Sequence, residues 1–483
     1  MIDRRTVLKS ALALPAAALL GPAAGARAAE LGPAWPAGAE PLYRLRVEEK
    51  EVAPFGTPIR GLLANGTWPG TPLCFTKGDL FRVMVENALP QPTTLHWHGL
   101  IVPNLEDGVP GVTQAPIGAG SALYYAFPLK QSGTYWYHSH FGLQEQQGLG
   151  GPLVIEDPDE PLVYDEDLTL FVNDVLGSPP DEVMKALKAD SLEVKVAAPY
   201  VPPGAKRFDT DVPYAGLLLN GAAPDRPWTK AVRPGARLRL RLINGTGSTY
   251  LRVALDGLGM TVVAADGEAV QPLEVDNLVL ATAQRYDVLV TLPESGSYTL
   301  HAAALGLDKQ ALAVLHTRDA EPRANAARPA FQGKALAVAD LTATRDTSLP
   351  HAPDRTYEVV LSGDMKRYLW QMNGETWPEP FSAFAGDQAR ETYYDVSYGQ
   401  VIRFDLVNRT PMVHPMHLHG HVFRVLAEGR DPATAPIRDT VSVPPNGKVS
   451  IEFLANNPGR WFFHCHNVWH LAVGMAQAVR YLV

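Results

Sequence analysis

The chain has 483 residues, too long for a single hydrophobic core, and this length predicts about three domains. Hydrophobic residues make up 46% and charged residues 19% of the sequence, which excludes a disordered chain. The formal net charge of −9 argues against a nucleic-acid-binding surface. There are two cysteines, Cys74 and Cys465, and the apolar run around Cys74 predicts a small core residue there.

The first stretch of the chain has the composition of a targeting peptide. Paired arginines precede an Ala- and Leu-rich run that ends near a small-x-small cleavage pattern at residues 26–28. The run contains two prolines and is short for a membrane-spanning helix. Residues 1–29 resemble a bacterial twin-arginine signal, which predicts export to the periplasm. An ordinary secretory signal with chance arginines is the alternative.

Beyond this stretch, strand-like segments separated by Pro and Gly recur, and convincing helices are scarce. One pattern occurs three times: a Gly-containing turn opens a strand, another strand follows, and an aromatic strand closes the unit. The closing strands fall at residues 132–140, 295–303 and 458–466. We therefore predict an all-β chain with three β-sandwich domains, over residues 40–158, 163–318 and 335–483.

The middle repeat lacks most of the histidines that mark the outer two. By alignment, the residues that replace the histidines 96 and 98 of the first repeat are Ala254 and Asp256. Only His301 remains of the later pair, and its default interpretation is vestigial or core, as for His316 and His351. The middle domain is therefore predicted to be structural, a spacer that sets the angle between its neighbours. It also contains one predicted helix, around residues 181–188.

Residues 460–475 concentrate metal-binding side chains near the end of the chain. The apolar run before His464 predicts a buried strand, in which alternate side chains point to opposite faces. His464 and His466 would then face one way and Cys465 the other, so that the cysteine binds one metal and the two histidines another. Thiolate, imidazole and thioether are soft ligands, and this set, completed by His470 and Met475, is typical of a blue copper centre.

Four His-x-His pairs lie in the outer repeats, and each pair would project from one face of its strand. The pairs are His96/His98, His138/His140, His417/His419 and His464/His466. One such pair can be core packing, but a buried neutral imidazole needs partners for both ring nitrogens, and four pairs are hard to satisfy by packing alone. With His414 and His470 they predict joint metal binding, and copper suits these donors.

These motifs carry a resemblance to a known family. HWHG, YWYHSH, HPMHLHG and HCHNVWHLAVGM look like the four copper motifs of three-domain multicopper oxidases, which include laccases. The resemblance covers nearly all of the chain after the targeting peptide, and it implies three cupredoxin-like Greek-key domains. Shorter matches, such as DGVPG from Asp107 and LSGDMKRYLW from Leu361, are similar to the periplasmic copper-resistance oxidases.

The resemblance implies four coppers per chain and a role for each ligand. The type 1 copper would be bound by His414, Cys465 and His470, with Met475 as the axial ligand. The type 2 copper would be bound by His96 and His417. One type 3 copper would be bound by His98, His138 and His466, and the other by His140, His419 and His464. His421 matches no ligand, and the cluster of three coppers would lie between the first and third domains.

The same resemblance implies routes for electrons and protons. Electrons would leave a reducing substrate at the type 1 copper and pass through Cys465 and its two histidine neighbours to the cluster, where O2 is reduced to water. Asp107 matches an acidic residue near the cluster in bacterial relatives, although Asp-Gly is also an ordinary turn signal. Some relatives carry a second acid directly after the later type 1 histidine, where this chain has Leu471. Glu145 is a candidate substitute.

Three functions fit this pattern to different degrees. A laccase-like oxidase would take electrons from phenols or aromatic amines, and a copper-homeostasis protein would oxidise or sequester Cu(I). A methionine-rich segment would favour the copper-homeostasis role, but the nine methionines of this chain form no run. Met412 and Met416 flank His414, and either can simply pack. A non-catalytic scaffold has no need for a complete ligand set. We expect a monomer with a small-molecule donor and O2 as partners, and no nucleic-acid or membrane partner.

Overall fold

The computed structural model describes residues 40–192, 208–293, 295–378 and 389–482. The predicted targeting peptide at residues 1–29 lies outside these residues. Among the described residues, no helix is long and apolar enough to cross a membrane. The described chain is built mainly of strands, which form six sheets, and each sheet draws its strands from one continuous part of the sequence. The prediction of an all-β chain is therefore confirmed.

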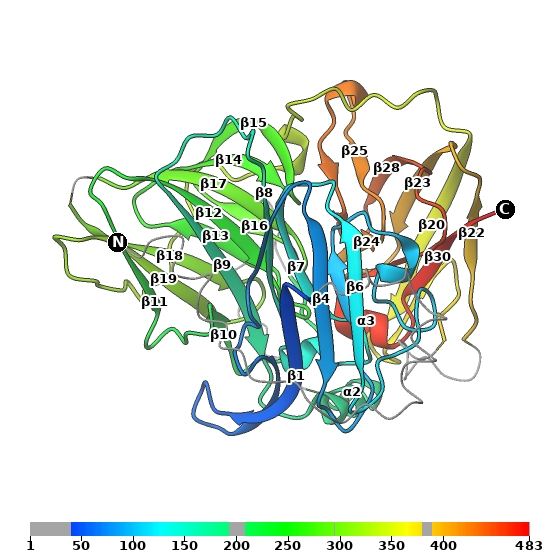
Figure 1. Ribbon diagram of the computed structural model, residues 1–483, viewed down its shortest axis with the longest axis horizontal. Coiled ribbons are helices and arrows are strands. Elements are labelled where there is room, and N and C mark those ends of the chain that lie inside the picture. The colour runs from blue at the N-terminus through cyan, green and yellow to red at the C-terminus, as the bar shows by residue number, and fades with distance from the viewer. Residues whose placement is uncertain (1–39, 193–207, 294, 379–388, 483) are drawn as a thin grey trace.

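Two four-stranded sheets form the first segment of the chain, drawn in blue and cyan in Figure 1. One has the order β2-β1-β4-β6, with β1 (Tyr43–Val52), β2 (Ile59–Ala64), β4 (Leu80–Asn87) and β6 (Ala122–Pro128). The other has the order β3-β8-β7-β5, with β3 (Leu73–Thr76), β5 (Leu95–His98), β7 (Gly133–Ser139) and β8 (Gly150–Glu156).

The middle segment, green in Figure 1, has a six-stranded and a five-stranded sheet. The six-stranded sheet has the order β10-β9-β12-β17-β14-β15, with β9 (Glu166–Val175), β10 (Gly216–Leu219), β12 (Arg237–Asn244), β14 (Met260–Ala265), β15 (Glu268–Val275) and β17 (Arg285–Thr291). The five-stranded sheet has the order β11-β19-β18-β13-β16, with β11 (Trp228–Val232), β13 (Leu251–Leu255), β16 (Leu278–Leu280), β18 (Ser297–Ala304) and β19 (Gln310–Thr317).

The last segment, yellow to red in Figure 1, repeats the arrangement of the middle one. Its six-stranded sheet has the order β21-β20-β23-β28-β25-β26, with β20 (Arg355–Asp364), β21 (Leu369–Met372), β23 (Val401–Asn408), β25 (Phe423–Leu426), β26 (Ile437–Arg438) and β28 (Lys448–Leu454). Its five-stranded sheet has the order β22-β30-β29-β24-β27, with β22 (Tyr393–Val396), β24 (His414–Leu418), β27 (Thr440–Val443), β29 (Arg460–Cys465) and β30 (Ala476–Tyr481).

The threefold sequence repeat has a counterpart in the strand pairing. The first long strand of each segment pairs in parallel with a later strand of the same sheet, as β1 with β4, β9 with β12, and β20 with β23. Parallel neighbours need a crossover connection, and a long connection that returns a later strand beside an earlier one is a feature of Greek-key sandwiches. The domain limits at residues 40–158, 163–318 and 335–483 stay predictions.

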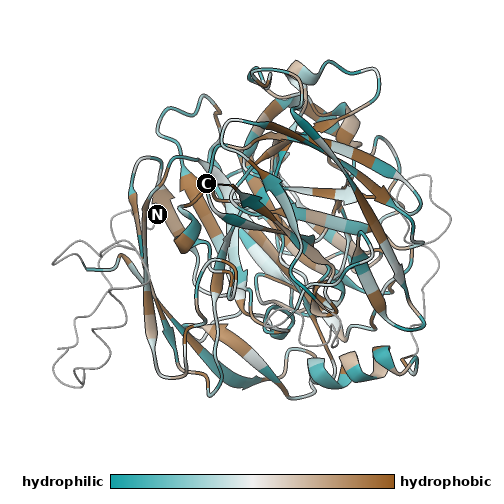
Figure 2. Ribbon diagram, turned by 90° about the vertical axis from the view of Figure 1, so that its right-hand side faces the viewer, coloured by the Kyte–Doolittle hydropathy of each residue, from teal (hydrophilic) through white to brown (hydrophobic). Residues whose placement is uncertain are grey.

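Alternating side chains explain why most of these segments form half-buried strands. Figure 2 shows hydrophobic and hydrophilic residues alternating in bands along the strands, as expected when one face meets the core. The short strand β3 follows this rule, because Leu73 and Phe75 are buried whereas Cys74 between them is exposed. The prediction that Cys74 is a core residue was therefore wrong. The predicted helix in the middle domain is present as α2 (Pro180–Lys188).

Candidate metal centre

Four strands, two from the first segment and two from the last, carry most of the predicted ligands. β5 and β7 pair antiparallel with His96 opposite His138, and β24 and β29 pair antiparallel with His417 opposite His464. Strand alternation sets the direction of these side chains: Trp97, between two histidines of β5, packs on Phe81 in the core with ring centroids 4.7 Å apart. The histidines of β5 therefore project from the other face.

The eight paired histidines meet in one buried cluster between the first and last segments. The Nε2 atom of His464 lies 3.3 Å from Nε2 of His140 and 3.0 Å from Nε2 of His419. Groups of three whose ligand atoms lie within 4.8 Å of one another include His96/His98/His138, His96/His417/His419 and His140/His419/His464. His466 completes the cluster, with its ring centroid 4.9 Å from that of His98 and 5.0 Å from that of His138.

The free ring nitrogens of this cluster fit a metal. Within the described part of the cluster, the buried imidazole nitrogens without a hydrogen-bond partner include Nε2 of His96, Nδ1 of His98, and Nε2 of His138, His417 and His466. In the rings of His96, His98, His138 and His417 the other nitrogen is engaged; for example, Nδ1 of His417 lies 2.8 Å from the carbonyl oxygen of Asp439. Buried polar atoms without partners are costly, and a metal-bound histidine has one nitrogen on the metal and the other hydrogen-bonded. Copper therefore fits the residues present.

Burial favours the neutral form, which is the form that binds metals, in seven of these imidazoles. Desolvation, followed by the neighbouring rings, lowers the pKa well below its ordinary value in six of the histidines: His98, His138, His140, His417, His419 and His466. Burial likewise lowers the pKa of His464 to about 3. Such rings carry no proton to displace at neutral pH.

Three buried carboxylates surround the cluster. Asp107 Oδ2 lies 3.0 Å from Nδ1 of His419, and its Oδ1 lies 3.2 Å from Nδ1 of His96. Glu145 Oε2 lies 2.8 Å from Nδ1 of His138, and its Oε1 lies 3.8 Å from Nδ1 of His466. The third, Asp439, has Oδ1 3.2 Å from Nε2 of His98. Carboxylates in these positions orient imidazoles and fix their tautomers.

The loop that holds Asp107 follows β5 closely. Asp107 ends the short 3₁₀ helix η2 (Asn104–Glu106), and Gly108 follows with a φ of 84°. A Cβ at Gly108 would lie 1.8 Å from the carbonyl oxygen of Leu95, so only glycine fits there. The Asp-Gly pair is thus a turn signal, and its aspartate also contacts the histidine cluster.

The predicted type 1 residues form a second buried group beside the cluster. Cys465 Sγ lies 3.6 Å from Nδ1 of His414 and 3.5 Å from Nδ1 of His470, and the two Nδ1 atoms lie 3.1 Å apart. Met475 is fully buried, and its backbone N–H donates to the carbonyl oxygen of His470 at 3.0 Å. Burial raises the pKa of the Cys465 thiol, so a bound cation is needed to keep it as thiolate.

The sequence reading missed Asp211, which contacts this second group from the middle segment. Its Oδ1 lies 3.1 Å from Nε2 of His470 and accepts a hydrogen bond from the Tyr368 hydroxyl at 2.8 Å, while Asn467 donates to Oδ2 at 2.6 Å. Burial alone would raise the pKa of Asp211, but these partners hold it below its ordinary value. Asp211 and His470 are 259 positions apart, and no local pattern marks the pair.

Histidines outside the predicted ligand set have ordinary partners. His421 is buried with Nε2 2.6 Å from the Tyr481 hydroxyl. His301 is buried with Nε2 3.1 Å from Asp256 Oδ1, which agrees with a vestigial or core role. His316 is half-buried and lies near two backbone carbonyl oxygens. His351 is exposed.

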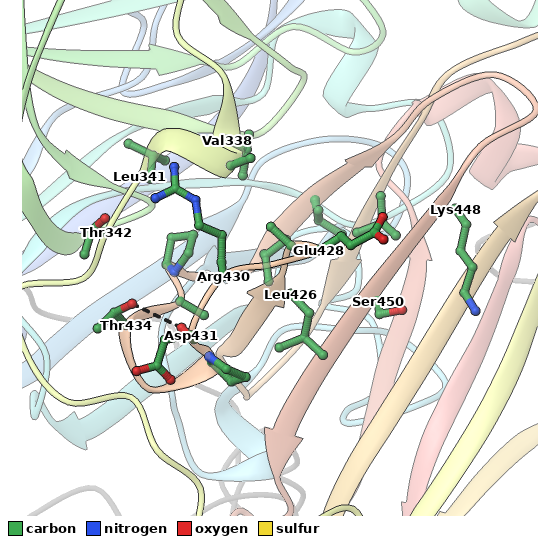
Figure 3. Close-up of a pocket in the computed structure, with 18 of the residues that line it drawn as sticks. Val338, Leu341, Thr342, Leu426, Glu428, Arg430, Asp431, Thr434, Lys448 and Ser450 are labelled. Carbon is green, nitrogen blue, oxygen red and sulfur yellow. Dashed lines mark hydrogen bonds between the residues drawn. The ribbon is translucent and has the colours of Figure 1, made fainter.

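A cavity of about 610 Å³ lies apart from both histidine groups. It is formed by β25, β28 and residues 338–342, and Figure 3 shows charged side chains around it, among them Glu428, Arg430 and Lys448. Its lining contains neither histidine nor cysteine. The cavity and the candidate metal centre are therefore separate features.

Comparison with known proteins agrees with this geometry. Three family models, each described as multicopper oxidase, match residues 46–160, 188–320 and 350–482. The chain therefore belongs to the multicopper oxidase family, copper-binding oxidases that use small-molecule substrates and O2, and its domains have the cupredoxin fold of that family.

Individual relatives cover most of the chain. It is 35% identical over 442 residues to the multicopper oxidase MmcO of Mycobacterium tuberculosis, covering 89% of this chain and 84% of that protein. It is 30% identical to copper resistance protein A of Pseudomonas syringae pv. tomato, covering 99% of each. Among solved structures, the laccase from Botrytis aclada superposes with a TM-score of 0.75 and 28% identity, covering 90% of this chain and 87% of that one.

Proposed function

We propose that this protein is a laccase-like oxidase that couples the oxidation of phenols or aromatic amines to the reduction of O2 to water. Four donor molecules each lose one electron and one proton, and one O2 takes up four electrons and four protons to give two waters. The observation that carries the proposal is the position of Cys465, which lies in one buried group while its bonded neighbours, His464 and His466, lie in the other.

The proposed ligands keep the roles that the resemblance implies, with four coppers per chain. His414, Cys465, His470 and the axial Met475 would hold the type 1 copper, and His96 and His417 the type 2 copper. The type 3 coppers would be held by His98, His138 and His466, and by His140, His419 and His464. Copper, when bound, supplies the one-electron chemistry at both places.

The remaining side chains prepare the site for that chemistry. Peptide bonds join Cys465 directly to His464 and His466, so a short covalent path links the two groups. Burial of every proposed ligand excludes bulk water. In the histidine rings, a hydrogen bond to one nitrogen keeps the other nitrogen directed toward the centre of the cluster.

Asp107 is the residue we propose to move protons at the cluster. It is fully buried, and its two carboxylate oxygens reach imidazoles from the first and last segments. Glu145 is the candidate for the second carboxylate, because it contacts His138 at 2.8 Å although Leu471 occupies the position of the acid in some relatives. Each would hold a proton at a carboxylate oxygen that faces the cluster.

A copper-homeostasis role, as a cuprous oxidase or a copper-binding protein, is the second candidate. The likeness to copper resistance protein A, over nearly the whole of both chains, favours it. In this role four Cu(I) ions replace the phenols and each loses one electron to become Cu(II), and the four protons that O2 takes up come from the solvent. The predicted signal at residues 1–29 supports a periplasmic location for either role, and we propose a monomer.

Copper content, the visible spectrum and a comparison of donors test the proposal. About four coppers per chain and an intense thiolate-to-copper absorption band are expected. Turnover is then measured with a phenolic dye and with Cu(I) under the same O2 concentration. A strong preference for Cu(I) would replace the laccase-like role by the copper-homeostasis role, a chain that binds only one copper would end the oxidase proposals, and a chain that binds none would end both roles.

A further inference from the structure

A buried arginine of the middle segment lies between the two segments that carry the histidines. Arg285, at the start of β17, has no exposed surface and makes two hydrogen bonds to Asp439 of the last segment. Its Nη1 lies 2.9 Å from Oδ1 and its Nη2 lies 2.6 Å from Oδ2. A planar guanidinium that holds a carboxylate by both oxygens fixes its position and its rotation.

Asp439 connects this arginine to the histidine cluster. Its Oδ1 lies 3.2 Å from Nε2 of His98, and its carbonyl oxygen lies 2.8 Å from Nδ1 of His417. The remaining nitrogens, Nδ1 of His98 and Nε2 of His417, are the partnerless atoms that face the cluster. One residue therefore orients a proposed type 3 ligand and a proposed type 2 ligand.

Two side chains of the middle segment also donate hydrogen bonds to the backbone of the first and last segments. Arg285 Nε donates to the carbonyl oxygen of Thr134 at 3.0 Å, on the strand β7 that leads to His138. Gln284, the residue before Arg285, donates through Nε2 to the carbonyl oxygen of Thr440 at 3.1 Å. Residues 284 and 285 thus fasten a ligand-bearing strand of the first segment and the 439–440 backbone of the last.

We propose that Arg285 is a positioning residue for the proposed trinuclear copper cluster, so that the middle segment takes part in building the cluster and is more than a spacer. The proposal rests on the proposed function. Lysine in place of Arg285 keeps the positive charge but cannot hold both oxygens of Asp439, so His98 and His417 would lose their fixed orientation.

The test compares Arg285→Lys with a matched control, Arg239→Lys. Arg239 is also buried, in the same six-stranded sheet, and holds Asp287 at 2.6 Å, but the carboxylates that it binds, Asp287 and Glu160, contact no proposed ligand. Both variants and the unaltered protein are loaded with copper. Copper per chain, the type 1 absorption band, the type 2 electron paramagnetic resonance signal and the copper affinity of the cluster, by chelator competition, are then measured.

Arg285→Lys is expected to keep the type 1 band, to change the type 2 signal and to weaken cluster copper about tenfold, the lower end of the range for residues that orient metal ligands. With the phenolic donor, its kcat is expected to fall while KM stays the same. An unchanged type 2 signal and affinity, or an equal loss in Arg239→Lys, would overturn the inference. If the unaltered protein itself binds no cluster copper, the proposed function fails instead.

If Arg285→Lys does not fold, the double variant Arg285→Met/Asp439→Asn takes its place. It removes both members of the buried ion pair together, which avoids leaving one charge unpaired in the interior. Loss of cluster copper with the type 1 band kept supports the inference, and cluster copper bound as tightly as in the unaltered protein overturns it.

Discussion

Asp107 is a buried carboxylate whose two oxygens contact imidazoles from opposite ends of the chain, at 3.2 Å from His96 and 3.0 Å from His419. The sequence predicted this residue from its motif, and the structure adds its partners. Glu145 had no comparable signal, because its contact with His138 depends on how the loop after β7 folds back. At the residue scale, therefore, the proposed ligands could be named from the sequence, whereas most of their hydrogen-bond partners could not.

Replacing Asp107 by Asn separates its proposed proton role from metal binding. Asparagine has nearly the same shape, and its oxygen can still accept one imidazole N–H, but it does not exchange a proton near neutral pH. We expect O2 consumption to fall by about 10²- to 10⁴-fold, the usual contribution of a positioned acid or base, with the type 1 absorption band unchanged. Unchanged turnover at saturating donor would remove Asp107 from the mechanism.

Glu106 is a second buried acid in the same loop, and it predicts a pH-dependent stability. Burial raises its pKa to about 7, partly offset by the backbone N–H of Ala126. Since the folded-state pKa lies above the unfolded value, the folded protein loses stability as the pH rises from about 4 to about 7, by up to about 3 kcal/mol. Glu106→Gln should therefore be more stable than the unaltered protein at pH 8 and equal to it at pH 4.5.

Urea unfolding of the metal-free protein at the two pH values measures this difference. The exposed Glu428→Gln serves as the control, because it changes the same net charge without a buried site. If the free energy of unfolding of Glu106→Gln fell with rising pH as much as that of the unaltered protein, Glu106 would not be the source of the pH dependence.

At the scale of elements, the turn from β29 into the short helix α3 (Val468–Ala472) brings Cys465 and His470 together, and backbone hydrogen bonds join both of them to Met475. Its strand was predictable, because an apolar aromatic run precedes the proposed ligands. Asn467 begins the helix by accepting a hydrogen bond from the Trp469 N–H at 3.1 Å, and its amide also donates to Asp211. That second contact joins α3 to the middle segment and has no signature in either stretch of sequence.

Asp211→Asn tests this contact through the reduction potential of the proposed type 1 site. Removing a negative charge beside His470 favours the reduced, less positive metal, so the potential should rise, by on the order of 50 mV for a partly screened charge at this separation. The amide keeps the shape of the side chain. Redox titration of the absorption band measures the change, and a lower potential would contradict the expected sign.

At the scale of the whole molecule, three repeated sandwiches were predictable from the Gly-punctuated repeat, and the strand pairing repeats accordingly. The contacts between segments were not. Arg285 and Asp439 are 154 positions apart, and neither lies in a recognisable motif. Within one sandwich, the alternation of buried and exposed side chains along each strand specifies which faces of the sheets pack together. Contacts between sandwiches depend on their mutual orientation, which this alternation does not specify.

Copper removal is expected to loosen the first segment from the last. The proposed cluster takes ligands from both, so bound copper stabilises their contact, and a thousandfold excess over the dissociation constant adds about 4 kcal/mol. The metal-free protein should unfold at a temperature lower by about 2 °C or more, the shift expected per 1 kcal/mol in a large domain. Thermal unfolding with and without a chelator measures this, and equal midpoints would contradict it.

The final ligands also set the timing of maturation. Residues 464–475 supply four ligands and Cys465 to the proposed centres, and β29 and β30 are the last strands of their sheet to leave the ribosome. A nascent chain that stops before them contains the histidines of β5 and β7 but has no place for a complete set of metals. The complete set of metals can therefore be held only after residues 464–475 have been synthesised, and chains terminated before them would be colourless and inactive.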